Sequence, residues 1–154
     1  LLAKTNTTED EINLIICATA TPDMPVSSTA SYVATEIGAT DAFAYDLQGA
    51  CSGFLFGMSA ASSHVSSGNY SKVLLIGADT MSSIIDYSDR STCVIFGDGA
   101  GAVLFEPNEE GLGLQDEVLR VDGKGRTYLK IEAGGAMLPA SNDTVAKKQH
   151  FLHQ

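Results

Sequence analysis

Apolar residues in the first half of the chain gather in short runs, separated by longer stretches in which small, polar and apolar residues mix. Three runs, at 12–18, 42–47 and 72–78, have the length of buried β-strands. The stretches 28–37 and 51–67 have a helical pattern, with serine or glycine at their ends as caps. This alternation of strands and helices predicts an α/β fold with a mostly parallel sheet covered by helices.

The second half is less regular and richer in glycine. Its pattern predicts a polar loop at 79–92, followed by two strands at 93–96 and 100–105. After these come a turn region at 107–113, a third strand at 114–121 and a glycine-rich loop at 122–140. Ser141 or Asn142 is expected to cap a final helix that continues to the end of the chain.

The composition is that of a folded acidic chain. Its 154 residues suffice for one ordinary domain, and 44% hydrophobic with 18% charged residues argues against disorder. Nine Lys and Arg against 19 Asp and Glu give a formal charge of −10. This charge repels phosphate backbones and anionic lipids, so nucleic acid and membranes are not expected as partners. No apolar run approaches the roughly 20 residues of a membrane-spanning helix.

The chain begins at Leu1 rather than Met and ends inside a predicted helix, so we expect both ends to be cuts in a longer chain. The three cysteines are too widely spaced for a disulfide framework or a zinc pair, and free thiols favour the cytoplasm. Cys17 and Cys93 lie in β-rich runs and are expected to be small buried apolar residues.

Cys51 stands in a different setting, the string GACSG at 49–53 between a predicted strand and a predicted helix. This is the strand–turn–helix context of a nucleophile elbow, with Cys rather than Ser at the nucleophile position. At the helix N-terminus the partial positive charge favours the thiolate, and backbone N–H groups can stabilise an oxyanion. A buried cysteine in a turn of small residues is the alternative, and spacing alone does not decide between them.

No base for Cys51 is found within the sequence. His64 lies 13 positions along the same predicted helix, which corresponds to roughly 20 Å. His150 and His153 are three apart on the predicted final helix but have no acidic or cysteine partner, so no metal site is predicted. Asp46, at the end of a predicted strand, is interpreted as a turn or cap residue.

The string FGDGAGA at 96–102 contains G-x-G-x-G, but it does not open a helix. A tight turn with close backbone packing is therefore favoured over a phosphate-binding loop. Arg90 lies ahead of it in a polar loop. It is either a surface charge or a contact to a phosphate-bearing ligand.

The residues as a whole resemble the β-ketoacyl-acyl carrier protein synthase III family, which has the thiolase fold and starts bacterial fatty acid synthesis. The resemblance covers most of positions 10–123, and ACSGF combined with DR-x-x-x-x-x-FGDGAGA is its most specific part. It rests on these strings: ATPDMP (20–25), DLQGACSGF (46–54), VLLIGADTMSS (73–83), DYSDRSTCVIFGDGAGAVLF (86–105) and LRVDG (119–123).

The resemblance implies a role for five residues. Cys51 matches the acyl-accepting nucleophile, and Arg90 matches the arginine that contacts the nucleotide end of coenzyme A. Met24 occupies the position of an aromatic residue that the neighbouring subunit inserts at the end of the acyl tunnel. Met81 falls where an apolar residue lines the tunnel, and Phe96 is expected in the core near the cysteine.

The implied reaction has two steps. Cys51 takes an acyl group from acyl-coenzyme A, and the acyl-enzyme then condenses with malonyl-acyl carrier protein with loss of carbon dioxide. The thioester is a substrate, and no cofactor or metal is implied. A homodimer is expected. The His and Asn that assist decarboxylation belong to the second half of the duplicated fold, so residues 1–154 are interpreted as an incomplete thiolase-like domain, inactive and poorly stable when isolated.

Other interpretations stay open. One is a related thiolase-like acyltransferase of specialised metabolism, or a hydroxymethylglutaryl-type synthase, which a panel of acyl acceptors would separate. A second is a cysteine hydrolase, in which the DR-x-x-x-x-x-FGDGAGA string has no role. A third is a non-catalytic dimerising fragment.

Overall fold

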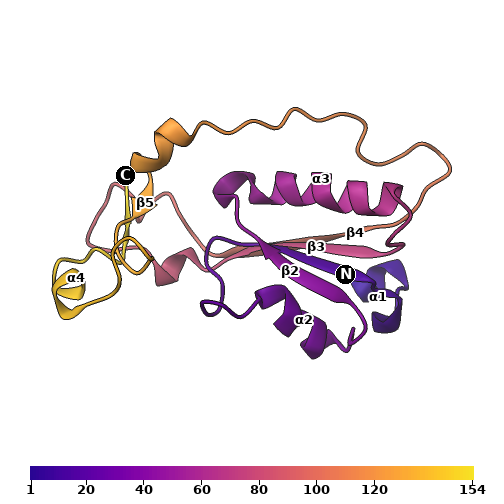
Figure 1. The fold of residues 1–154 in the computed structure, drawn as a ribbon, viewed down its shortest axis with the longest axis horizontal. Helices are drawn as coiled ribbons and strands as arrows, with labels where there is room; N and C mark the ends of the chain where they lie inside the picture. The colour runs from indigo at the N-terminus through magenta and orange to yellow at the C-terminus, as the bar shows by residue number, and fades with distance from the viewer. The chain divides into compact units, whose positions relative to one another are not determined.

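A computed structural model describes residues 1–154. The chain forms two compact units, and Figure 1 labels their helices and most of their strands. Unit 1 comprises Leu1–Asp79 and Gly99–Leu119, and unit 2 comprises Thr80–Asp98 and Arg120–Gln154. None of the helices combines the length and the apolar content that crossing a membrane requires.

Unit 1 is built on a four-stranded sheet. Its strands are β1 (Leu14–Ala18), β2 (Phe43–Leu47), β3 (Val73–Asp79) and β4 (Gly99–Phe105). The order is β2-β1-β3-β4, in which β1 runs parallel to both of its neighbours and β4 runs antiparallel to β3. The mostly parallel sheet predicted from the sequence is therefore confirmed.

Two helices, α2 (Thr29–Ile37) and α3 (Gly53–Ser66), cover opposite faces of this sheet (Figure 1). Successive residues of β1 point to opposite faces, so Ile15 packs in the cluster under α2, whereas Leu14 and Ile16 pack in the cluster under α3. All five residues of β1 are buried, which explains why this strand is apolar throughout.

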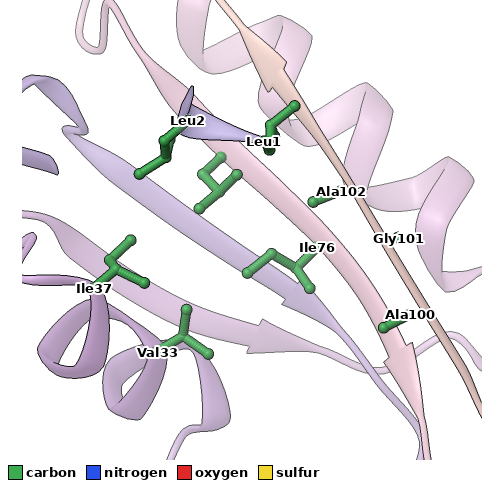
Figure 2. A pocket seen from close by; sticks show the side chains of 9 residues that line it. Leu1, Leu2, Val33, Ile37, Ile76, Ala100, Gly101 and Ala102 are labelled. Carbon is green, nitrogen blue, oxygen red and sulfur yellow. The ribbon is translucent and has the colours of Figure 1, made fainter. Parts of the chain in front are cut away.

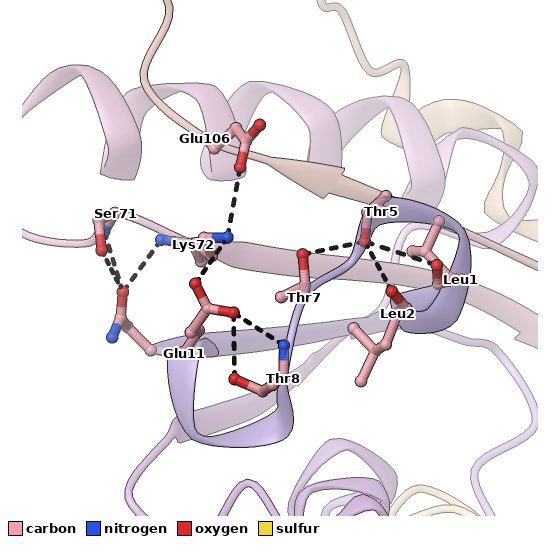
Figure 3. Close-up of polar contacts among 10 residues, drawn as sticks. Leu1, Leu2, Thr5, Thr7, Thr8, Glu11, Ser71, Lys72 and Glu106 are labelled. Carbon is pink, nitrogen blue, oxygen red and sulfur yellow. Dashed lines mark hydrogen bonds and ion pairs between the residues drawn. The ribbon is translucent and has the colours of Figure 1, made fainter.

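Lys72 joins three segments of unit 1 (Figure 3). Its Nζ lies 3.0 Å from Oε1 of Glu11 and 3.6 Å from Oε2 of Glu106. Glu11 ends the short 3-10 helix η1 (Glu9–Glu11) and also accepts the backbone N–H of Thr8 at 2.8 Å. Two hydrogen bonds lower the pKa of Glu11 from 4.5 to about 2. The larger effect comes from the Thr8 backbone N–H and the next from Lys72.

Unit 2 contains only short elements: η3 (Met81–Ser83), η4 (Gly123–Thr127), β5 (Lys130–Ile131), α4 (Asn142–Ala146) and β6 (Leu152–His153). β5 and β6 pair antiparallel. The N–H of Leu152 donates to the carbonyl of Ile84 at 2.8 Å, and Nζ of Lys148 lies 2.7 Å from the Asp86 carboxylate. These contacts join two segments that lie far apart in the sequence.

The predicted strand at 93–96 is wrong, because the chain around Cys93 forms turns. The N–H of Cys93 donates to the carbonyl of Asp89 at 3.0 Å, and the two apolar residues that follow are exposed. Side chains such as Asp89 bond to nearby backbone and so compete with extended structure. Cys93 is consequently half-buried in a turn, whereas Cys17 is buried in a strand as predicted.

Three further segments differ from the expectation. Residues 114–121 form no strand. Ser141 caps the last helix as predicted, but this helix ends at Ala146, shortly before Lys148 adopts a left-handed φ of 56° that a helix cannot accommodate. The histidines after it therefore do not share a helix. The short helix α1 (Leu2–Thr5) has no signal in the hydrophobic pattern.

Candidate functional site

The turn between β2 and α3 carries the candidate nucleophile. A 3-10 turn, η2 (Ala50–Ser52), leads directly into α3, so the predicted strand–turn–helix arrangement is confirmed. Ala50 has a left-handed φ of 46°, which costs an L-residue about 1 kcal/mol. Gly49 permits the close approach of the helix, because a Cβ there would lie 2.6 Å from Cδ2 of Phe56 and 2.9 Å from Cα of Gly53.

Cys51 is exposed in this turn, two positions before Gly53, the first residue of the 14-residue helix α3. Its position at the helix N-terminus favours negative charge. Cys17 lies in the opposite situation: burial, followed by the charge of Asp46, raises the pKa of its thiol from 9.0 to about 11. Of these two thiols, only Cys51 is accessible to a reagent in solvent.

Met24 lies in the loop between β1 and α2. We call residues 22–27 the Met24 loop, and all six are exposed. The Met24 side chain is 58% exposed, and Val26 has a left-handed φ of 76°, an unfavourable conformation for a β-branched residue. The loop thus holds an apolar side chain in solvent in a defined, strained backbone conformation.

Arg90 is exposed in unit 2 and has no carboxylate within ion-pair distance. The two aspartates near it in the sequence have other partners. Asp89 accepts the N–H and the hydroxyl of Ser91 at 2.9 and 2.7 Å, and Asp86 pairs with Lys148. Hydrogen bonds lower the pKa of both carboxyls. The largest contribution comes from Lys148 for Asp86 and from the Ser91 hydroxyl for Asp89. The guanidinium charge is therefore available to an anionic ligand.

Met81 and Phe96 also lie in unit 2, and both are half-buried. One carboxylate links their segments, since Asp98 accepts both the N–H and the hydroxyl of Ser82 at 2.7 Å. The structure thus holds Met24 and Cys51 in unit 1, and the other three residues with an implied role in unit 2.

The glycines of the FGDGAGA string do not pack closely against other backbone. A Cβ added to Gly97, Gly99 or Gly101 would meet no atom within 4 Å, so the expected close packing is wrong for this chain. The segment runs into β4 rather than into a helix, which agrees with the argument against a phosphate-binding loop.

The histidines lie in separate settings. His64 belongs to an aromatic group near the end of α3, with Nε2 3.5 Å from the Tyr45 hydroxyl and its ring 5.2 Å from that of Tyr70. It is thus half-buried. His150 Nε2 lies 2.9 Å from Oγ1 of Thr144. No group of three or more His, Cys, Asp or Glu side chains is arranged to hold a metal ion.

A hollow of about 330 Å³ lies beside α2, against the face of the sheet formed by β3 and β4 (Figure 2). It contains no nucleophilic or titratable side chain. Its lining is apolar throughout: Leu1, Leu2, Val33, Ile37, Leu74, Ile76, Ala100, Gly101 and Ala102.

Known proteins are similar to this chain in sequence and in fold. A family model described as 3-oxoacyl-[acyl-carrier-protein (ACP)] synthase III matches residues 45–123. The chain is 50% identical over 154 residues to β-ketoacyl-[acyl-carrier-protein] synthase III 2 of Bacteroides thetaiotaomicron. That match covers 100% of this chain and 46% of the relative, so the chain spans less than half the length of this protein.

Solved structures give the same result. A crystal structure of a 3-oxoacyl-(acyl-carrier-protein) synthase III superposes with a TM-score of 0.92 at 30% identity, over 100% of this chain and 49% of that chain. The priming β-ketosynthase from the R1128 polyketide biosynthetic pathway superposes with a TM-score of 0.82 at 29% identity. This match covers 99% of this chain and 44% of that chain. The fold is the thiolase-like α/β fold expected from the sequence. The chain belongs to the 3-oxoacyl-[acyl-carrier-protein] synthase III family.

Proposed function

We propose that the protein carrying this chain is a 3-oxoacyl-acyl carrier protein synthase III that begins fatty acid synthesis. It transfers an acyl group from acyl-coenzyme A to Cys51 and then condenses this group with malonyl-acyl carrier protein. The observation that carries the proposal is the exposed Cys51 in the turn that opens α3, in a chain of this family.

In the first step the Cys51 thiolate attacks the thioester carbonyl of acyl-coenzyme A. The new carbon–sulfur bond forms as the bond to coenzyme A breaks, and the coenzyme A thiolate leaves and takes up a proton. The N-terminus of α3 stabilises the attacking thiolate, and backbone N–H groups of the same turn are suited to the oxyanion of the tetrahedral intermediate.

In the second step malonyl-acyl carrier protein loses carbon dioxide, and the resulting carbanion attacks the acyl carbonyl on Cys51. A carbon–carbon bond forms, and the bond to the Cys51 sulfur breaks. No residue of this chain is assigned to the His and Asn roles of the family. We propose that residues 1–154 form one part of a duplicated fold whose other part supplies them, which agrees with the 46% of the Bacteroides relative that the chain covers.

Four residues are assigned to contacts with the substrate. Arg90 has an unpaired guanidinium and is assigned to the phosphates of coenzyme A. Met24, Met81 and Phe96 are assigned to the acyl chain. Methionine is flexible where the family has an aromatic residue, so a broader range of acyl chains is expected at Met24.

A second copy of the chain is the proposed partner. β2 is an edge strand of the sheet, with Phe43 53% exposed at its start, and an unpaired edge is a surface along which a second strand can pair. We place the protein in the cytoplasm, because its three cysteines are free.

A condensing enzyme of specialised metabolism is the second candidate, favoured by the likeness to the priming β-ketosynthase of a polyketide pathway. The two candidates share the acylation of Cys51 and differ in the acyl primer. A panel of acetyl-, branched and longer acyl-coenzyme A thioesters, each followed by malonyl-acyl carrier protein, separates them by the primer that gives the highest kcat/KM.

The proposal is tested by incubating the full-length protein with acyl-coenzyme A and locating the acyl group by peptide mass spectrometry. We expect one acyl group, on Cys51, and its conversion to a 3-oxoacyl product when malonyl-acyl carrier protein is added. Cys51→Ala should abolish both, whereas Cys93→Ala should retain both. Acylation spread over all three cysteines, or none at all, would contradict the proposal.

A further inference from the structure

The loop that leaves β1 is anchored at both of its ends by carboxylates from the two neighbouring strands. In the order β2-β1-β3, Asp46 lies on β2 and Asp79 is the last residue of β3. The chain emerges from β1 between them and forms the Met24 loop before it enters α2. Asp46 was interpreted from the sequence as a turn or cap residue, but Asp79 was not singled out.

Asp79 holds the start of the loop. Its Oδ1 accepts the backbone N–H of Ala20 at 2.8 Å and the hydroxyls of Thr19 and Thr21 at 3.2 and 3.1 Å. The Thr19 hydroxyl in turn accepts the N–H of Thr21 at 3.0 Å. Hydrogen bonds to a charged acceptor are stronger than neutral ones, so three donors on one carboxylate fix this segment firmly.

Asp46 holds the end of the loop. Its carboxylate accepts the backbone N–H groups of Thr29 and Ala30, both at 2.8 Å, and the hydroxyl of Ser28 at 3.0 Å. These N–H groups belong to the first turn of α2, where a negative charge is favoured and the donors have no partner within the helix.

Between the anchors, the Met24 loop has no core of its own. It contains two prolines, which restrict the backbone, and Val26 keeps a left-handed φ that is maintained only where the surroundings enforce it. The conformation of the loop therefore depends on its ends, and the position of Met24 depends on the anchors.

We propose that Asp79 is a positioning residue that acts through Met24 to restrict the length of the acyl chain that the protein accepts. This inference rests on the proposed function, in which Met24 contacts the acyl chain. Asp79 is a better site for a test substitution than Asp46. Asp46 lies on the strand that leads directly to Cys51, so its substitution would also disturb the position of Cys51.

A double-mutant cycle in the full-length protein tests the inference, with the ratio of kcat/KM for hexanoyl- and acetyl-coenzyme A as the readout. Asp79→Ala releases the loop, so this ratio is expected to rise about tenfold, the lower end of what one methylene group contributes to discrimination. Met24→Ala is expected to raise the ratio similarly, and adding Asp79→Ala to it should change the ratio no further. Asp79→Asn keeps an oxygen acceptor and should restore most of the wild-type ratio.

Asp10→Ala is the matched control, because Asp10 is exposed in η1, outside the Met24 loop. If Asp79→Ala lowers kcat/KM equally for both thioesters, or shifts the ratio as much in the Met24→Ala background as in the wild type, the inference is wrong while the proposed function stands. If the wild-type protein accepts neither thioester on Cys51, the proposed function fails and the inference fails with it.

Discussion

Gly57 of α3 lies directly against Leu75 of β3, so closely that a Cβ on Gly57 would stand 2.5 Å from Cδ1 of Leu75. Leu75 is fully buried and has little room to give way. The same helix comes close to Gly77, where an added Cβ would lie 2.8 Å from the Phe54 ring. These glycines, one on the helix and one on the strand, determine how near the helix that follows Cys51 lies to the sheet.

Gly57→Ala should therefore destabilise the protein. Overpacking costs typically 1–3 kcal/mol, and the higher helix propensity of alanine offsets about 1 kcal/mol of it, so a net loss of about 1–2 kcal/mol is expected in urea unfolding. Gly123→Ala is the control, since a Cβ there meets no atom within 4 Å. Equal stability of the two variants would show that α3 can move away from the sheet without cost.

The three cysteines should differ in their rates of alkylation. Cys17 is buried with a pKa raised to about 11, so only about one such thiol in a thousand is ionised at pH 8. Cys51 is exposed at a helix N-terminus, and we expect iodoacetamide to modify it at least about tenfold faster than Cys17 or the half-buried Cys93. Peptide mass spectrometry over time measures the three rates. Unfolding in urea should make them similar, whereas similar rates in the native protein would contradict the assignment of Cys51.

The contribution of Glu11 to stability should depend on pH. Its pKa falls from 4.5 to about 2 on folding, so the folded state favours the charged form, and the stabilisation is complete above pH 4.5. It is lost as the pH falls through about 2. Glu11→Gln should therefore lower the free energy of unfolding at pH 7, and the difference from the wild type should shrink steadily below pH 4.5. Glu109→Gln, at an exposed carboxyl without an ion pair, is the comparison variant and is measured over the same pH range.

The proposed pairing of two copies along β2 predicts that Phe43→Lys yields a monomer. Each copy would then carry a lysine on the edge strand that is proposed to pair, and lysine on an edge strand is a common means of preventing strand pairing. Sedimentation velocity on the full-length protein measures the change. Tyr32→Lys places the same charge on the exposed face of α2 and should leave the dimer intact. A dimer that survives Phe43→Lys would place the interface elsewhere.

The sequence was informative where one physical cause dominated. Burial on both faces makes β1 apolar throughout, so its position could be predicted within two residues. Small residues around Cys51 indicated the sharp turn before α3, and the structure has that turn. The apolar run after Cys93 was misleading, because its local pattern resembles a strand while its neighbours Asp86 and Asp89 bond to the chain around them.

The anchoring role of Asp79 was beyond prediction from local sequence. Its donors lie 58 to 60 positions away, and only the register of β1 with β3 brings them together. The division of the candidate site residues between two units likewise depends on long-range packing, which no spacing of motifs along the chain records.

The left-handed conformation of Ala50 has a consequence for the position of Cys51. Glycine would adopt this conformation at no cost, yet the chain has a methyl group there. Because a methyl group disfavours this conformation, the turn is maintained only where the strand before it and the helix after it enforce it. Folding of the flanking strand and helix therefore also fixes the backbone at Cys51, and the thiol is held in one position at the start of α3.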